Sequence, residues 1–250
     1  MDQSPHTIRR PRHPHWQSPT ADVYFTSDTV TVDLWRIPLD RFPTTEWLSE
    51  DELARMRRYR FEKDQRKFAV ARSSLRQILS YYIQTHPKDI AFEYGTRGKP
   101  FLQTNERGIN FNLSHSGEYA LCGVAQYALG VDIEQLKPME RLDGLIKRCL
   151  APSEQCLLAQ TSAASKSAKF LEYWTCKEAY LKATGQGISE SLAAIEIILE
   201  PAPIINVSGP PWQLQTFSPC EGYTAALVAD PSITQMRFWN HDHVHAVQDT

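Results

Sequence analysis

The sequence passes twice from helical segments to extended segments, and this repeated order constrains the fold more than any other feature. Hydrophobic periodicity in the first half predicts a strand at 30–37, helices at 49–59 and 62–84, and strands at 89–94, 109–113, 119–125 and 129–134. The second half predicts helices at 140–149, 153–160 and 168–183, then strands at 194–199, 212–217, 223–229 and 235–239. Helices and strands that follow one another in blocks are typical of an α+β fold. We therefore predict two similar α+β lobes.

The boundaries of these lobes follow from composition along the chain. Residues 1–22 are expected to form a flexible N-terminal tail, because four prolines prevent a regular helix there. The N-terminal lobe is predicted to span 23–131, and the C-terminal lobe 132–250. We expect the last two strands before residue 135 to form one hairpin, and the small-residue segment 161–167 to link two helices.

The overall composition excludes several classes of protein. With 42% hydrophobic residues and a net charge of −2, the chain cannot be disordered throughout. No run of about 18 uncharged apolar residues and no apolar signal segment is visible, so we expect no membrane helix and no secretion. Five cysteines without a CxxC spacing disfavour a disulfide scaffold or a zinc ribbon and favour the cytoplasm. The absence of βαβ alternation and of GxGxxG disfavours a dinucleotide-binding fold.

The near-neutral net charge hides an uneven distribution. Residues 1–131 contain 18 Lys and Arg against 15 Asp and Glu, whereas residues 132–250 contain 9 against 14. Between Arg55 and Arg76, nine side chains are basic and two are acidic. This basic segment is interpreted either as a solvated helix surface or as a binding wall for an anion or an acidic protein. Its charges lie on several faces without interleaved exposed aromatic residues, so a nucleic-acid partner is not predicted.

The segment Gly130-Val-Asp-Ile-Glu134 carries the sharpest chemical signal. Successive side chains of a strand point to opposite faces, so Val131 and Ile133 should be buried while Asp132 and Glu134 project together from the other face. Two carboxylates roughly 7 Å apart along a strand can share one hard cation such as Mg²⁺. The alternative is the solvated face of an amphipathic strand.

A predicted helix contains Trp174-Thr-Cys-Lys-Glu-Ala-Tyr-Leu-Lys182. Glu178 and Lys182 lie one turn apart on one face of this helix, and Trp174 lies one turn earlier. Glu178 can complete an oxygen cage for a cation, with lysines reaching towards phosphates. The alternative is an ordinary surface pair, which contributes about 0.2–0.5 kcal/mol.

A third segment, Ile109-Asn-Phe-Asn-Leu-Ser-His-Ser-Gly117, contains a predicted strand that presents Ser114 and His115 at its end. Hydroxyl, imidazole and free backbone N–H groups at a strand end suit a phosphate. A Ser/His nucleophile pair is disfavoured, because Ser114 and His115 are adjacent and point apart, and no Gly-x-Ser-x-Gly elbow surrounds them. A polar turn without a ligand is the remaining alternative.

Two further segments contain groups that bind phosphates or metals in other proteins. Gly98-Lys99-Pro100 is a rigid basic loop, but it lacks the Walker spacing, so P-loop chemistry is excluded. His241, His243 and His245 would lie on one side of an extended segment, yet a chain terminus rarely has the order that a metal site needs. We therefore assign no native ligand role to these histidines.

The motifs GKP, NLSHS, GVDIE and W-x-x-KEA-x-x-K occur in this order, and over about residues 60–187 the chain resembles the 4′-phosphopantetheinyl transferases of the Sfp type. The resemblance implies a pseudo-dimer of two similar α+β lobes with the active site in the cleft between them. It implies transfer of 4′-phosphopantetheine from coenzyme A to a serine of an apo acyl or peptidyl carrier protein, with release of 3′,5′-ADP. It further implies Mg²⁺ (or Mn²⁺) dependence and a cytoplasmic monomer with no nucleic-acid or membrane partner.

The resemblance also implies roles for individual residues. The acids that would bind Mg²⁺ are Asp132, Glu134 and Glu178. Lysines near the pyrophosphate would be Lys182 and Lys177, and contacts to the phosphates of coenzyme A would come from Ser114 and His115. The nucleotide-binding loop would contain Gly98 and Lys99, and the looser matches to partners of the 3′-phosphate are Lys63 and Arg72.

For this reaction we predict two catalytic residues, Glu178 and Lys182. A serine hydroxyl is a weak nucleophile, so Glu178 is predicted to act as the base, directly or through a metal-bound water. Lys182 would stabilise charge that develops on the phosphates. Two alternatives stay open: an Mg²⁺-dependent phosphohydrolase that uses the same carboxylates on water, and a non-catalytic carrier-protein-binding module.

Overall fold

The computed structural model describes residues 13–19, 30–187 and 192–241. Its first half forms β1 (Thr31–Pro38), α1 (Glu50–Arg57), α2 (Glu62–Ile83), β2 (Phe92–Tyr94), β3 (Pro100–Leu102), β4 (Asn110–Ser116), β5 (Tyr119–Ala125) and β6 (Leu129–Gln135). The second half forms α3 (Leu142–Cys149), α4 (Pro152–Ala159), α5 (Ala163–Thr184), β7 (Glu196–Ile198), β8 (Ile204–Asn206), β9 (Gln213–Phe217), β10 (Tyr223–Ala229) and β11 (Gln235–Asn240). The predicted α+β class is confirmed. No helix in these described ranges has both the length and the apolar content to cross a membrane.

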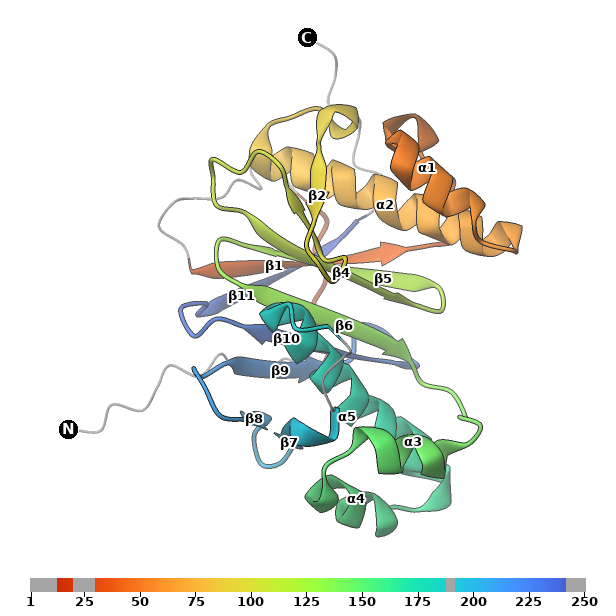
Figure 1. Ribbon diagram of the computed structural model, residues 1–250, viewed down its shortest axis with the longest axis vertical. Coiled ribbons are helices and arrows are strands. Elements are labelled where there is room, and N and C mark those ends of the chain that lie inside the picture. Colours follow the sequence, from red (N-terminus) through yellow and green to blue (C-terminus); the bar gives the residue numbers. More distant parts are fainter. Residues whose placement is uncertain (1–12, 20–29, 188–191, 242–250) are drawn as a thin grey trace, which may run out of the picture.

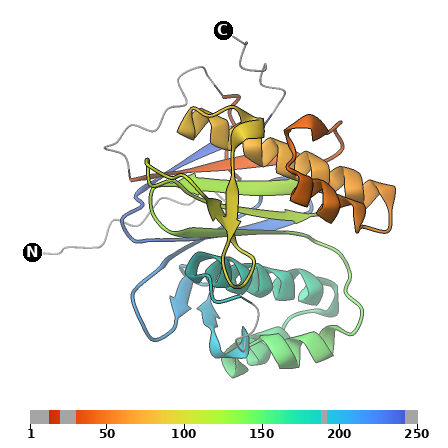
Figure 2. The same ribbon diagram turned by 45° about the horizontal axis from the view of Figure 1, so that its top comes forward.

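Two sheets form the centre of the molecule. The first has the strand order β11-β1-β5-β4, and the second has the order β6-β10-β9. Figure 1 shows that α1 and α2 cover the outer face of the first sheet and that α5 covers the outer face of the second. The short hairpin β2–β3 lies beside the first sheet, and Figure 2 shows it reaching towards α5. Each sheet with its helices forms one lobe, as the repeated helix-then-strand order predicts.

Alternation along the strands creates the layers of the core. In β1, Trp35 and Ile37 pack with α2, while Val32 and Leu34 point to the opposite face and pack with residues of the second sheet. All four side chains are fully buried. A third apolar cluster fills the space between the second sheet and the helices α3, α4 and α5. The two lobes therefore share a core between their sheets, and each also has a core of its own under its helices.

The strand near the C-terminus does not belong to the lobe that the sequence predicts. β11 pairs in parallel with β1 in the first sheet, although the two strands are about 200 residues apart. The buried carboxylate of Asp33 accepts hydrogen bonds from Arg237 Nε at 2.6 Å and Trp239 Nε1 at 2.8 Å. A buried charge requires such partners, so β11 is held against β1. The predicted boundary between residues 131 and 132 also falls inside β6.

Part of the predicted flexible tail contacts the first sheet. The backbone N–H of Gln17 donates to the carbonyl of Phe238 at 2.9 Å, and the Trp16 ring packs edge-on against the Phe238 ring. The guanidinium of Arg36 lies 4.8 Å from the centroid of Trp16. Residues 13–19 therefore pack on the first sheet, because Trp16 supplies an apolar and cation-binding surface; the rest of the predicted tail that precedes residue 23 lies outside the described residues.

Two local predictions in the middle of the chain are wrong. β5 and β6 do not form a hairpin: β5 pairs with β1 and β4, whereas β6 pairs with β10 in the other sheet. The turn between β5 and β6 therefore carries the chain from one lobe to the other. The small-residue segment 161–167 is not a linker throughout, because α5 already begins at Ala163. Alanine and lysine are good helix formers, which explains the longer helix.

Candidate functional site

The candidate site begins on the face of β6 that is turned towards α5. Val131 and Ile133 are fully buried between the two sheets, so Asp132 and Glu134 project from the opposite face, as the alternation predicts. Gly130 brings α5 close to this face, because a Cβ atom at this position would lie 2.1 Å from the carbonyl oxygen of Ala179. The close approach places helix side chains next to the strand carboxylates.

The seam between β4 and β6 joins the two lobes through side chains. The two strands belong to separate sheets and share no backbone ladder. Instead, Asn112 Oδ1 accepts a hydrogen bond from the backbone N–H of Val131 at 2.8 Å. Two serines further along the same face of β4, Ser114 and Ser116, also reach β6. The edge of β6 is thus bound by polar side chains that alternate along β4.

Ser114, Asp132 and Lys182 form one compact group at this seam. Ser114 Oγ donates to Asp132 Oδ1 at 2.6 Å, and Lys182 Nζ lies 2.6 Å from the same oxygen. Lys182 Nζ also donates to Ser114 Oγ at 2.9 Å. Because Asp132 is buried, removal of Lys182 would leave its carboxylate desolvated without a counter-charge. The structure therefore brings together a strand acid, a helix lysine and the serine that the sequence singles out.

Glu134 and Glu178 complete an acidic group around Asp132. Burial raises the pKa of both glutamates above its usual value, and the negative charge of Asp132 raises both further. Ser116 opposes this shift at Glu134 through a hydrogen bond of 2.7 Å to Oε2. Crowded, partly desolvated carboxylates of this kind attract a cation.

Two oxygens in this acidic group fit a hard cation. Asp132 Oδ2 and Glu178 Oε1 are buried and have no hydrogen-bond partner among the described residues. Buried polar atoms normally have partners, so these two mark places where a cation or a ligand can bind. In the described ranges, however, no three His, Cys, Asp or Glu side chains are already arranged as a metal site.

The loop that contains Gly98 and Lys99 closes one end of this site. Both residues line a pocket of about 230 Å³ together with Glu178 and Lys182. Lys99 Nζ donates to the backbone carbonyls of Lys182 and Leu129, so the loop of one lobe is tied to α5 and β6 of the other. Burial lowers the pKa of Lys99. The structure thus places the predicted nucleotide loop beside the acidic group.

His115 lies at the same end of β4 but on the other face. His115 lies on the same face of β4 as Phe111, which packs under α2. Its ring therefore points away from the side chain of Ser114, which lies on the opposite face. Desolvation lowers the pKa of His115, and the positive charge of Lys182 lowers it further. Lys67 and Arg55 contribute in the same direction. Asp132 opposes this shift, so His115 lies where positive charges of both lobes and the carboxylate of Asp132 all act on it.

Lys177 does not lie near the other predicted site residues. Its ammonium is fully buried and donates to Glu154 Oε2 at 2.5 Å and to the carbonyls of Cys149 and Leu192 at 2.9 and 3.0 Å. Neighbouring residues on a helix point about 100° apart, so Lys177 cannot face the same way as Glu178. The predicted contact of Lys177 with a pyrophosphate is therefore wrong. The residue instead ties α5 to α3, α4 and the segment before β7.

Replacing Lys177 by Met should lower the free energy of unfolding by about 3–5 kcal/mol, because it leaves the Glu154 carboxylate buried without its counter-charge. Lys166→Met is the matched control: Lys166 pairs with Asp143 at 2.9 Å on the surface, and its loss should cost less than about 1 kcal/mol. Urea unfolding of both variants measures the difference. Equal effects would contradict the structural role of Lys177.

Arg72 and Lys63 are also placed away from the acidic group. The buried guanidinium of Arg72 donates to Glu52 Oε1 at 2.6 Å and to the hydroxyl of Tyr94 at 3.2 Å. Arg76 binds the other oxygen of Glu52 at 2.7 Å. Arg72 and Arg76 therefore share the single negative charge of Glu52, and the guanidinium of Arg72 is held inside the lobe rather than presented to a 3′-phosphate as predicted. Lys63 lies exposed in the first turn of α2, with its ammonium over Phe61.

Several functional and structural partners were not predicted from the sequence. Asn112 and Ser116 bind β6 on either side of Ser114, and their period-two spacing along β4 was the available signal. Glu52 and Glu154 are buried acids that neutralise basic residues, and no local pattern distinguishes them from surface glutamates. Of the terminal histidines, His241 is buried beside Gln77, and the other two lie outside the described residues.

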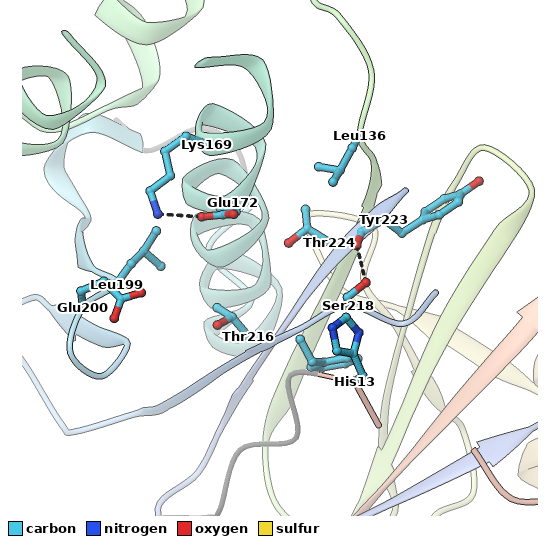
Figure 3. A pocket seen from close by; sticks show the side chains of 11 residues that line it. His13, Leu136, Lys169, Glu172, Leu199, Glu200, Thr216, Ser218, Tyr223 and Thr224 are labelled. Atoms are coloured by element: carbon cyan, nitrogen blue, oxygen red, sulfur yellow. Dashed lines mark hydrogen bonds and ion pairs between the residues drawn. The ribbon is translucent and has the colours of Figure 1, made fainter. Parts of the chain in front are cut away.

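A second pocket lies on the other side of α5 and is shown in Figure 3. It has a volume of about 380 Å³ and lies between α5 and the ends of β9 and β10. In this pocket Lys169 Nζ lies 2.9 Å from Glu172 Oε2, and Ser218 Oγ donates to the carbonyl of Tyr223 at 3.1 Å. It shares no lining residue with the pocket beside Gly98. The chemistry of the chain is therefore concentrated at the seam.

Comparisons with known proteins agree on one family. Family models match at residues 128–228, described as the 4′-phosphopantetheinyl transferase superfamily, and at residues 35–126, described as 4′-phosphopantetheinyl transferase, N-terminal. Similar proteins include the 4′-phosphopantetheinyl transferase HetI of Nostoc sp., which is 40% identical over 90% of this chain and 98% of its own length. The 4′-phosphopantetheinyl transferase Sfp of Bacillus subtilis is 25% identical over 73% of this chain and 82% of its own.

Among solved structures, a holo-(acyl-carrier-protein) synthase from Bacillus anthracis in complex with CoA (3′,5′-ADP) is 27% identical and matches 41% of this chain and 94% of its own, with a TM-score of 0.38. The two family models together cover most of the sequence, and the 40% identical relative is matched over nearly its whole length. The chain therefore belongs to the 4′-phosphopantetheinyl transferase superfamily.

Proposed function

We propose that the chain transfers the 4′-phosphopantetheine group of coenzyme A to a serine hydroxyl of an apo acyl or peptidyl carrier protein and releases 3′,5′-ADP. Membership of the family supports this class of reaction. The observation that carries the proposal is the group at the seam: Lys182 lies 2.6 Å from Asp132, with the desolvated carboxylates of Glu134 and Glu178 beside them. A cationic and metal-binding site of this kind suits a pyrophosphate ester.

The proposed cation is Mg²⁺, and Mn²⁺ would also fit. Asp132, Glu134 and Glu178 would hold it, because they offer hard oxygen donors and two of their buried oxygens have no hydrogen-bond partner among the described residues. When bound, the cation neutralises the charge of the phosphates and of the departing phosphate oxygen. We further propose that Lys182 adds positive charge at the pyrophosphate from the helix side.

The other residues of the site are proposed to hold coenzyme A. Gly98 and Lys99 form one wall of the pocket next to Glu178 and suit the nucleotide part of the molecule. The positive charges of Lys182, Lys67 and Arg55 act on the imidazole of His115. A phosphate in contact with this imidazole would therefore be attracted by basic groups of both lobes. This arrangement would fix the pyrophosphate across the seam, where orientation of the reacting groups lowers the barrier.

Glu178 is proposed to accept the proton of the attacking serine. Burial raises the pKa of its carboxyl group, which makes the carboxylate a better base than a solvated glutamate. Glu178→Gln should lower kcat by about 10²–10⁴-fold, because the amide cannot accept the proton. The measurement is holo-carrier formation at saturating Mg²⁺. A variant with near-normal turnover would show that Glu178 is not the base.

The test of the proposed function is incubation of the chain with coenzyme A, Mg²⁺ and a panel of apo-carrier proteins, followed by mass spectrometry of each carrier. We expect at least one carrier to gain the mass of a single phosphopantetheinyl group on a serine. A carrier that binds the chain without any gain in mass would instead support the non-catalytic module. The panel contains fatty-acid, polyketide, peptide and aminoadipate carriers.

We also propose that the chain works as a monomer in the cytoplasm. Both lobes and every residue of the proposed site come from one chain, so a second copy is not needed to complete it. All five cysteines are free thiols, which fits a reducing compartment. Size-exclusion chromatography with light scattering tests the monomer, and a dimer at micromolar concentration would contradict it.

A further inference from the structure

Ser116 is the last residue of β4 and connects both lobes at the proposed metal site. Its hydroxyl donates to Glu134 Oε2 at 2.7 Å and accepts from the backbone N–H of Gln135 at 3.1 Å. One oxygen atom from the first lobe therefore contacts both a carboxylate and the neighbouring backbone of the second lobe. The hydroxyl itself is held in place by this pair of contacts.

The contact at Ser116 repeats the contact at Ser114 one step along the strands. Ser114 Oγ donates to Asp132 Oδ1 at 2.6 Å, and two residues further along both strands Ser116 Oγ donates to Glu134 Oε2 at 2.7 Å. Each serine of β4 thus holds one oxygen of the acid that faces it on β6. Ser114 is additionally bound by Lys182, whereas Ser116 contacts strand residues only.

A flexible carboxylate needs such a partner to bind a cation well. The side chain of a glutamate has several rotatable bonds, and ordering them when a ligand binds costs free energy. A fixed hydrogen bond to one carboxylate oxygen removes part of that cost in advance and sets the direction of the other oxygen. Partners of this type around metal ligands commonly change metal affinity by about 10–100-fold.

We propose that Ser116 is a positioning residue: its hydroxyl orients the Glu134 carboxylate towards the cation that Glu134 shares with Asp132 and Glu178. Ser116 itself touches neither the cation nor the substrate. The inference rests on the proposed function, because it assumes that these acids bind the cation. The packing of β4 against β6 would then have a second role, because it orients the Glu134 carboxylate before the cation binds.

The experiment compares Ser116→Ala and Ser116→Thr in the full chain by titration with Mn²⁺ in the presence of coenzyme A, followed by electron paramagnetic resonance. We expect Ser116→Ala to raise the Kd for Mn²⁺ about tenfold, while Ser116→Thr, which keeps the hydroxyl, stays within about twofold of the unchanged chain. Transfer by Ser116→Ala should need more Mg²⁺ but recover most of its kcat at saturation. Thermal unfolding without metal reports on the fold separately.

Ser153→Ala is the matched control. The hydroxyl of Ser153 donates to the carboxylate of Glu196 in the same lobe but outside the site, so its loss should leave the Kd for Mn²⁺ unchanged. A Kd for Ser116→Ala equal to that of the unchanged chain would overturn the inference, whatever happens to thermal stability. If the unchanged chain itself binds no Mn²⁺ with coenzyme A, the proposed cation site fails as well. The two failures are therefore distinguishable.

Discussion

Asp132→Asn should lower kcat/KM for carrier loading by about 10³-fold, because it removes a preorganised charge from the centre of the site. Asparagine keeps the size of the side chain and can still accept from Ser114, but it removes the negative charge that pairs with Lys182 at 2.6 Å. Asp132 Oδ2 is buried and has no hydrogen-bond partner among the described residues. In asparagine this position is taken by an NH₂ group, which cannot bind a cation, or by a neutral carbonyl oxygen, which is a weaker ligand than a carboxylate. The rate of holo-carrier formation across a range of Mg²⁺ concentrations measures the effect.

Asp143→Asn provides the comparison for this substitution. Asp143 pairs with Lys166 at 2.9 Å, but its side chain is 89% exposed on α3, so removal of its charge should leave transfer unchanged. A raised Mg²⁺ requirement for Asp132→Asn alone would support the assignment of Asp132 as a metal ligand. Activity of Asp132→Asn within about threefold of the unchanged chain would contradict it, since loss of one preorganised charge normally costs far more.

Gly130→Ala should lower the free energy of unfolding by about 3 kcal/mol, because the added methyl group has no space. Its Cβ would lie 2.1 Å from the carbonyl oxygen of Ala179 and 2.3 Å from the backbone nitrogen of Ala183. Both are backbone atoms of α5, so no side-chain rotation can relieve the contact. The helix would have to move away from β6 and would carry Glu178 and Lys182 with it.

Gly144→Ala is the control for this prediction. Gly144 lies in α3, and a Cβ added there meets no atom within 4 Å. Alanine is the better helix former, so this variant should be as stable as the unchanged chain or more stable by up to about 1 kcal/mol. Urea unfolding measures both variants. An unchanged unfolding midpoint for Gly130→Ala would show that α5 does not need its close approach to β6.

Much of the site could be predicted because it depends on local periodicity. The alternation of β6 places Asp132 and Glu134 on one face, and the helical period of α5 places Glu178 and Lys182 on another. These two patterns hold in any fold that packs the helix on the strand. The resemblance to the family then indicated that the two faces meet, and the hydrogen bonds at Asp132 show how.

The errors arose where distant parts of the chain decide the structure. Lys177 and Lys182 lie in one helix and look alike in the sequence, yet Glu154 captures Lys177 in the core while Asp132 binds Lys182 at the seam. Likewise, β5 and β6 have the sequence of a hairpin, because only three residues separate two apolar runs. Their partners are set by packing, since β5 lies between β1 and β4 while β6 lies beside β10.

The partner of a buried charge is the feature that sequence periodicity cannot supply. Glu52 binds Arg72 and Arg76, which lie 20 and 24 residues away along the chain. Within the basic segment that begins at Arg55, these two arginines are therefore internal, and the charge that remains for an anionic ligand is smaller than the composition suggests. A charge count along the sequence treats buried and exposed groups alike, and only the fold separates them.

The central claim is that the carboxylates of β6 and α5, together with Lys182, serve transfer to a carrier serine rather than transfer to water. The most direct test measures holo-carrier and 3′,5′-ADP in the same reaction, with Mg²⁺ and with the metal chelated. We expect equal amounts of the two products with Mg²⁺ and neither product after chelation. Release of 3′,5′-ADP with free phosphopantetheine, while the carrier stays unmodified, would contradict it and identify a phosphohydrolase.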